Sequence, residues 1–178
     1  MTTNKFHTFI TILVKKIFQE SKILPASLFA PLPNGNLLHC AKGFENNDDK
    51  QSTLNMYATI LAVQQIQMYS FASEAWMARE NPGPFVAPSQ RSDRQECLFI
   101  TTCDKQDNHY HTMLKVERTP DKVQLIQSDT EIADRFDDRI KLFDRVDNSK
   151  LTKHDLKKIA KEYELLEKPS WYNEIIME

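Results

Sequence analysis

The chain has 178 residues, of which 40% are hydrophobic and 27% charged, and its formal net charge is -2. A chain of this length can bury about 70% of its unfolded surface, so it can form an ordinary core without disulfide or metal staples. Its three glycines lie far apart, which excludes the glycine-rich phosphate loops of nucleotide sites, and its near-neutral charge provides no global attraction for nucleic acids or anionic membranes.

The N-terminal region is predicted to be an amphipathic helix. Apolar residues recur at three- and four-residue steps from Phe6 to Phe18, the pattern of a helix that packs one face on a core. The apolar run at 9–14 is short and lacks a cleavage site, so we predict neither a membrane span nor a signal peptide. Three cysteines without a Cys-x-x-Cys pair are typical of a reducing compartment, and we expect a cytoplasmic protein.

A hairpin and a second helix are predicted next. Residues 27–30 and 36–41 flank Asn34-Gly35, a dipeptide that favours a tight turn because both residues tolerate positive φ. Asp48 and Gln51 have the spacing of a capping box at a helix N-terminus. We therefore expect a second helix to begin there and to pack on a sheet.

The segment from Tyr69 to Met77 allows two interpretations. Its composition favours helix, so the second helix could continue as far as Arg79. Its alternating side chains instead predict a strand with two distinct faces. Beyond it, an antiparallel meander of three strands is predicted at residues 96–103, 110–117 and 122–127.

The C-terminal third is predicted to form a helical hairpin. Apolar residues at helical spacing indicate one helix at about 129–143 and another at about 153–166. We expect two domains, an α+β core at 1–128 and a helical appendage at 129–178 that packs on the core. The predicted fold class is α+β, with an antiparallel sheet of about four to six strands, two helices on one face of the sheet and this C-terminal helical hairpin.

One stretch of the sequence is similar to a known group of proteins. It contains Ser73-Glu74-Ala75-Trp76-Met77-Ala78, Pro88-Ser89, Asp93-Arg94, Glu96 and an apolar run from Cys97 to Thr102. This stretch resembles an uncharacterised family of small bacterial and phage proteins. The resemblance implies that the Ser-Glu-Ala-Trp segment is a strand, followed by a proline-rich loop and a second strand. It implies no activity and no catalytic residue.

The long connection at residues 80–94 is the main candidate for a functional site, because ordered domains rarely keep such a loop without using it. Arginine can bind carboxylate or phosphate groups and an aromatic ring can anchor a partner, so we predict a recognition surface. Glu74, on the strand that enters the loop, is either an acidic member of this surface or the structural partner of Arg94. The predicted binding residues are Glu74, Trp76, Phe85, Arg91, Asp93 and Arg94.

Two cysteines and two histidines raise the question of a zinc site, because thiolate and imidazole ligands suit zinc. These residues are Cys97, Cys103, His109 and His111. If Cys103 pairs with an even-numbered residue such as Tyr110, both histidines point to the other face and no site forms. A shift of one residue would bring Cys103 near His111. The sequence favours the first register and buried structural cysteines, so neither a metal nor a cofactor is predicted.

Two weaker signals lie in the C-terminal third. Residues 144–155 resemble a degenerate EF-hand calcium loop, but Val146 and Ser149 replace an oxygen ligand and the turn glycine. We therefore favour a helix N-cap at Thr152 over a calcium site. Lysines at helical spacing form a stripe that could bind phosphates, although nearby acidic residues favour a solvated face. The stripe consists of Lys150, Lys153, Lys157, Lys158 and Lys161.

The sequence favours a non-catalytic binding or accessory protein whose partner is another protein, with homo-oligomerisation left open. No Gly-x-Ser-x-Gly, His-Glu-x-x-His or similar catalytic motif occurs. The alternative is a small hydrolase or metal-dependent enzyme assembled from the dispersed residues Glu74, His39, and His109 or His111. A nucleic-acid-binding module that uses the lysine stripe is the third and least favoured hypothesis.

Overall fold

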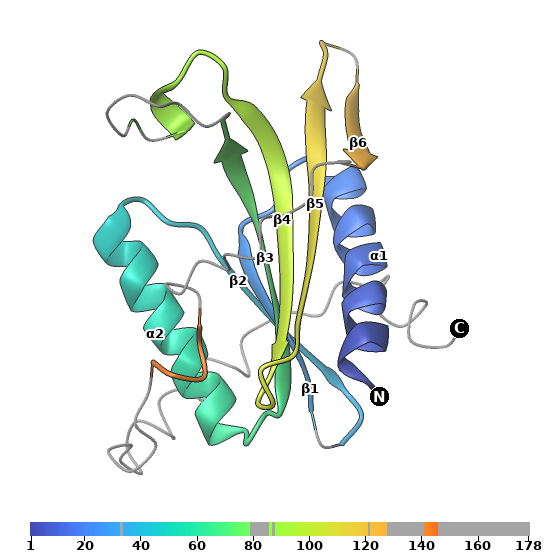
Figure 1. The fold of residues 1–178 in the computed structure, drawn as a ribbon, viewed down its shortest axis with the longest axis vertical. Coiled ribbons are helices and arrows are strands. Elements are labelled where there is room, and N and C mark those ends of the chain that lie inside the picture. Colours follow the sequence, from blue (N-terminus) through green and yellow to red (C-terminus); the bar gives the residue numbers. More distant parts are fainter. Residues whose placement is uncertain (33, 79–85, 87, 121, 128–140, 146–178) are drawn as a thin grey trace.

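The computed structural model describes residues 1–32, 34–78, 86, 88–120, 122–127 and 141–145 (Figure 1). Its helices are α1 (Thr3–Ser21), α2 (Asn47–Val63) and the short 3-10 helix η1 (Pro88–Gln90). Its strands are β1 (Ala26–Pro31), β2 (Leu37–Lys42), β3 (Met68–Met77), β4 (Gln95–Asp104), β5 (His109–Arg118) and β6 (Val123–Gln127). The two α-helices, the hairpin and the meander predicted before residue 128 are confirmed.

The six strands form one antiparallel sheet in the order β2-β1-β3-β4-β5-β6. The predicted α+β class is therefore confirmed. β3 pairs with β4 along its full length, from Met68 opposite Asp104 to Met77 opposite Gln95. β1 pairs with β3 only from Ser70 to Ala72. Among the described strands, none lies beside residues 74–77 on the β1 side of β3.

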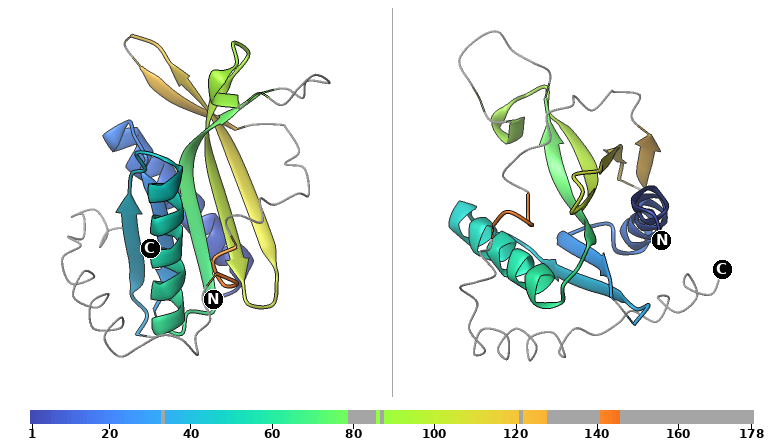
Figure 2. Two further views of the ribbon diagram at one scale, coloured as in Figure 1. Left: turned by 90° about the vertical axis from the view of Figure 1, so that its left-hand side faces the viewer. Right: turned by 60° about the horizontal axis from the view of Figure 1, so that its bottom comes forward.

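The two α-helices cover opposite faces of the sheet (Figure 2). α1 shares a core cluster with Phe29, Leu98 and Leu114, whereas α2 shares another with Leu28 and Phe71. The prediction that both helices cover one face is wrong. The neighbouring residues Leu28 and Phe29 point to opposite faces and both are fully buried, so the centre of the sheet must be covered on both sides.

The N-terminus of α2 lies slightly earlier than predicted. Asn46 is the N-cap, and its side-chain oxygen accepts a hydrogen bond of 2.9 Å from the backbone N–H of Asp49. The prediction of a cap at Asp48 is therefore wrong. Asn46 and Asp49 have the same spacing as Asp48 and Gln51, so the sequence contains two possible N-caps. The helix uses the earlier one, Asn46, and is therefore two residues longer.

The segment from Tyr69 to Met77 is a strand, and the alternative of a helix as far as Arg79 is wrong. α2 ends at Val63, and Gln65 in the turn after it adopts a left-handed φ of 52°. β3 then pairs with β4, and α1 and α2 bury the two faces of its first half. These tertiary contacts outweigh the helix propensity of the segment.

Beyond residue 127 the chain is described only at residues 141–145, which form a turn instead of the end of a helix. The rest of the predicted helical hairpin, the lysine stripe and the EF-hand-like loop beyond Arg145 lie outside the described residues. The proposed boundary between the two domains stays a prediction. No α-helix in the described part of the chain is long and apolar enough to cross a membrane.

The 141–145 segment packs on the core beside α2. Leu142 is buried, and its N–H donates a hydrogen bond of 3.1 Å to the hydroxyl of Tyr69. The ring of Phe143 meets the ring of Tyr69 edge-on at a centroid distance of 5.0 Å. Arg145 donates hydrogen bonds to Gln51 and Asn55 of α2. This part of the predicted appendage therefore contacts the core directly.

Candidate functional site

Trp76 and Arg94 lie together where β3 enters the long connection. Trp76 is 43% exposed, although tryptophan is usually largely buried. The guanidinium carbon of Arg94 lies 4.5 Å from the centre of the indole ring, which is a cation–π contact. We refer to Trp76, Arg94 and the β3 backbone at 74–77 as the Trp76 surface.

Two other predicted site residues, Arg91 and Asp93, pair with each other. The Arg91 guanidinium donates two hydrogen bonds of 2.8 and 2.7 Å to the Asp93 carboxylate. Arg94 donates to the backbone carbonyl of Ser89, and no carboxylate among the described residues forms an ion pair with it. The guanidinium of Arg94 can therefore still bind a carboxylate of a partner, whereas that of Arg91 is already paired with Asp93. Phe85 lies outside the described residues.

Glu74 belongs to a separate cluster. Its carboxylate accepts a hydrogen bond of 3.2 Å from Arg118, which also donates to Glu96 and to the carbonyl of Lys22. The predicted structural pairing of Glu74 with Arg94 is wrong, because β5 places Arg118 beside it instead. The Arg118 cluster ties the end of α1 to β3, β4 and β5, which is a structural role.

The two carboxylates of the Arg118 cluster have different electrostatic environments. Burial raises the pKa of Glu74, whereas hydrogen bonds from Arg118 hold the pKa of Glu96 below its usual value. The same hydrogen bonds with Glu96 raise the pKa of Arg118. Glu96 is therefore the main anionic partner of Arg118, and Glu74 is secured by a backbone hydrogen bond from Leu24.

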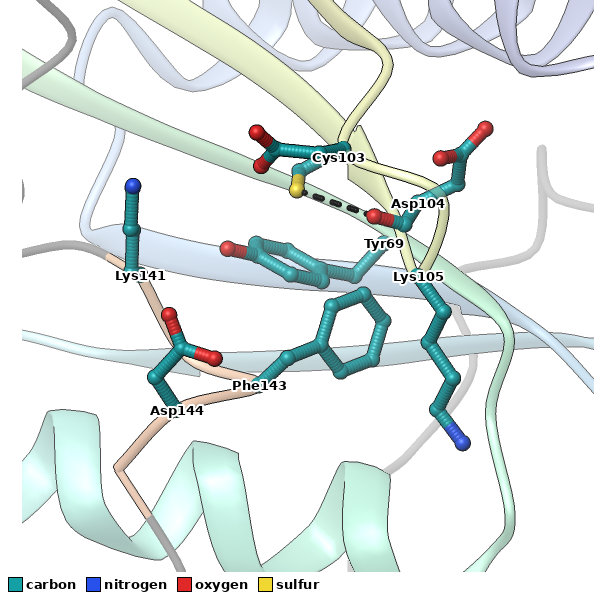
Figure 3. A pocket seen from close by; sticks show the side chains of 8 residues that line it. Tyr69, Cys103, Asp104, Lys105, Lys141, Phe143 and Asp144 are labelled. Atoms are coloured by element: carbon teal, nitrogen blue, oxygen red, sulfur yellow. Dashed lines mark hydrogen bonds between the residues drawn. The ribbon is translucent and has the colours of Figure 1, made fainter.

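A hollow of about 530 Å³ lies at the other end of the central strands, beside the β4–β5 turn (Figure 3). Side chains of β3, β4, the turn and the 141–145 segment form its wall. They are Tyr69, Cys103, Asp104, Lys105, Asp107, Lys141, Phe143 and Asp144. The hollow therefore combines two aromatic rings with charges of both signs, as many binding sites for small ligands do.

The carboxylate of Asp104 builds the turn beside the hollow. It accepts hydrogen bonds from the backbone N–H groups of Gln106 (2.9 Å) and Asn108 (3.0 Å), and from the hydroxyl of Thr3 on α1. Burial acts to raise the pKa of Asp104, but these hydrogen bonds outweigh it and the pKa is lowered. The turn also places Asp107 in the left-handed region, with a φ of 64°. The carboxylate thus stays ionised and fixes the turn.

Cys103, Asp107 and His109 come together at this turn. Cys103 lies directly opposite His109 in the β4–β5 pairing, and His109 Nε2 lies 2.7 Å from Asp107 Oδ1. The predicted register, with Cys103 opposite an even-numbered residue such as Tyr110, is wrong by one residue. Burial, reinforced by the charge of Asp107, raises the pKa of the Cys103 thiol to about 11, so the sulfur is protonated at neutral pH.

The remaining histidines and cysteines of the alternative hypotheses add no ligand atom to this group. Cys97 lies on the same face but about 20 Å along β4. His111 stacks on the ring of His109 at a centroid distance of 6.2 Å and on Phe99 at 5.9 Å. His39 stacks on Phe29 on the α1 face, at 4.4 Å, and burial lowers its pKa to about 4. The dispersed enzyme site predicted from Glu74, His39 and His109 or His111 is therefore not assembled.

Comparisons with models of protein families, with curated proteins and with solved structures found no match to this chain. The resemblance of the Ser-Glu-Ala-Trp stretch to a bacterial and phage family therefore stays a prediction. Sequence reasoning missed Arg118 and Asp107, which strand pairing and turn geometry bring to Glu74 and His109. Cys103 and His109 are both odd-numbered, which places them on one face only in the register that the structure shows.

Proposed function

We propose that the protein is a non-catalytic binding protein that recognises an extended segment of a partner protein at the Trp76 surface. The observation that carries this proposal is the exposed indole ring of Trp76 beneath the guanidinium of Arg94. Tryptophan and arginine, together with tyrosine, are the side chains most enriched among the residues that dominate binding energy at protein interfaces. An exposed pair of this kind at the end of a sheet is therefore a suitable anchor for a partner.

The chemistry of the surface defines the partner segment. Arg94 has no carboxylate partner among the described residues, so it favours an Asp or Glu on the partner. The indole ring favours an apolar side chain beside that carboxylate. Because no described strand lies beside residues 74–77 on the β1 side, this edge can accept the backbone of an extended peptide.

The positions of the histidines support a binding role over the alternative enzyme. Glu74 is held by Arg118 at one end of β3, whereas His109 lies at the opposite end of β5. His39 is packed against Phe29 on β1. A general acid–base pair needs its groups within reach of one substrate atom, and these three residues do not offer that arrangement.

Selection from a random peptide library on the immobilised full chain tests the proposal. We expect enriched peptides to share an acidic residue next to apolar residues. These peptides should bind the wild-type protein, so passing them over it removes them, whereas passing them over Trp76→Ala or Arg94→Gln should not. Arg91→Gln is the matched control, because it removes a guanidinium that is already paired with Asp93. Enriched peptides that bind Trp76→Ala as well as the wild type would contradict the proposal.

A further inference from the structure

Three side chains with metal-binding atoms converge at the β4–β5 turn. The thiol of Cys103, the carboxylate of Asp107 and the imidazole of His109 place their ligand atoms within 4.8 Å of one another. From this convergence we propose that Cys103, Asp107 and His109 form a zinc-binding site. The site lies at the far end of β4 from the Trp76 surface and does not depend on the function proposed for that surface.

The strand register places two of the ligands. Cys103 ends β4 and His109 begins β5, and the two are direct cross-strand partners. Side chains of such partners lie on the same face with Cβ atoms about 5 Å apart, which a single ion can bridge. Asp107 joins them because its left-handed backbone, with a φ of 64°, turns the side chain back toward His109.

The turn that carries the ligands is already held in shape by groups other than the ligands. Asp104 accepts hydrogen bonds from the backbone of Gln106 and Asn108, and also from the Asn108 side chain. The backbone N–H of Asp107 donates to the carbonyl of Asp104 at 3.1 Å. Because the backbone geometry is fixed in this way, binding an ion would cost little ordering of the chain.

The chemical types of the three ligand atoms favour zinc over other divalent ions. One sulfur, one imidazole nitrogen and one carboxylate oxygen suit zinc, whereas calcium and magnesium require sites made almost entirely of oxygen. Around a tetrahedral zinc ion the nitrogen and oxygen ligands lie about 3.3 Å apart, given bond lengths of about 2.0 Å. His109 Nε2 and Asp107 Oδ1 lie 2.7 Å apart, so a small side-chain movement opens room for the ion between them.

Three protein ligands leave the fourth position of a tetrahedral ion open. Cys103 and Asp107 both line the 530 Å³ hollow, so we expect this position to face the hollow. Once an ion is bound, this position is available to a water molecule or to a ligand in the hollow. Binding converts the Cys103 thiol to a zinc thiolate, and the proton released from sulfur passes to the solvent. No electron transfer is involved.

Metal content and calorimetry on the full chain test the site directly. We expect protein treated with a chelator and then titrated with zinc chloride to bind one ion per chain. Cobalt chloride in place of zinc should give the intense near-ultraviolet absorption of a thiolate bound to cobalt. Asp107→Asn and His109→Asn should each weaken zinc binding by at least about tenfold, because the first replaces an anionic carboxylate ligand with a neutral amide and the second removes the imidazole. Excess magnesium should not displace the zinc.

Matched variants separate this site from adventitious binding. Cys97→Ser removes another buried cysteine on the same face of β4, and His39→Asn removes another half-buried histidine, so both should bind zinc like the wild type. If Cys103→Ser does not fold, the exposed Asp107→Asn substitution gives the same test. Absence of zinc binding, or equal affinity in Asp107→Asn, His109→Asn and wild-type protein, would overturn the proposal.

Discussion

Arg94 lies over the face of Trp76, with its guanidinium carbon 4.5 Å from the ring centre, and the tryptophan stays 43% exposed. Removing this ring should therefore disturb binding much more than folding. We expect Trp76→Ala to change the free energy of unfolding by less than about 1 kcal/mol. Phe71→Ala on the same strand should cost about 3 to 5 kcal/mol, because Phe71 is buried. Urea unfolding measures both, and equal losses would show that Trp76 is a core residue.

The Arg118 cluster should contribute to stability, since one guanidinium serves two carboxylates and a carbonyl. Arg118→Gln should lower the free energy of unfolding by about 1 to 2 kcal/mol, because it removes several charge-assisted hydrogen bonds at once. Arg91→Gln, which breaks an isolated pair with Asp93, should cost at most about 0.5 kcal/mol. Equal effects of the two substitutions in urea unfolding would contradict a structural role for the cluster.

His7 should make the stability depend on pH. Its ring nitrogens lie 2.7 Å from the hydroxyl of Thr102 and 2.9 Å from that of Thr112. Burial, with a smaller effect of the charge of His111, lowers its pKa from 6.5 to about 4. Because the unfolded chain takes up the proton first, the stability that His7 contributes is complete above pH 6.5 and is lost as the pH falls toward 4.

The size of this pH dependence can be isolated by substitution. A histidine that is protonated only in the unfolded state contributes a slope of about 1.4 kcal/mol per pH unit. Burial also lowers the pKa of His39 and of His111, so His7→Gln should remove the contribution of one of three histidines and leave a smaller slope than the wild type. Unfolding free energies measured from pH 5 to pH 7 give the slopes. Identical slopes would contradict the lowered pKa of His7.

The docking of the 141–145 segment can be tested through Tyr69. Its hydroxyl accepts the N–H of Leu142, so Tyr69→Phe leaves a buried N–H without that acceptor while keeping the ring against Phe143. We expect a loss of about 1 to 2 kcal/mol in stability and faster hydrogen exchange at Leu142. Tyr57→Phe removes a hydroxyl that bonds to Ala26 instead, and it should leave exchange at Leu142 unchanged.

The local patterns of the sequence were sufficient to predict most of the helices and strands. They did not predict the register between strands or which face of the sheet each helix covers. The alternation of side chains at 69–77 indicated the strand that is observed, but the helix propensity of the same residues left both interpretations open. The register of β4 against β5 could not be inferred, because β4 is apolar on both faces, as buried Cys97 and Leu98 show. The register is set instead by the hydrogen bonds of Asp104 in the turn.

The candidate sites were predictable to a similar extent. Trp76 and Arg94 were both named as binding residues, and the structure brings them into contact. The partner of Glu74 was not predicted, because Arg118 lies 44 residues away in the sequence. The pairing of β3, β4 and β5 brings the two residues together. The hollow beside Cys103 was also missed, because residues 141–143 were expected to end a helix of the C-terminal appendage.

The affinity of a peptide selected on the wild-type chain, measured by calorimetry for matched variants, tests the central proposal most directly. If Trp76 is the anchor of the recognition surface, Trp76→Ala should weaken binding by about thirtyfold or more, as expected for a residue worth about 2 kcal/mol at an interface. Arg94→Gln should also weaken it, and Arg91→Gln should bind like the wild type. Equal affinity of the wild type, Trp76→Ala and Arg94→Gln would contradict the account.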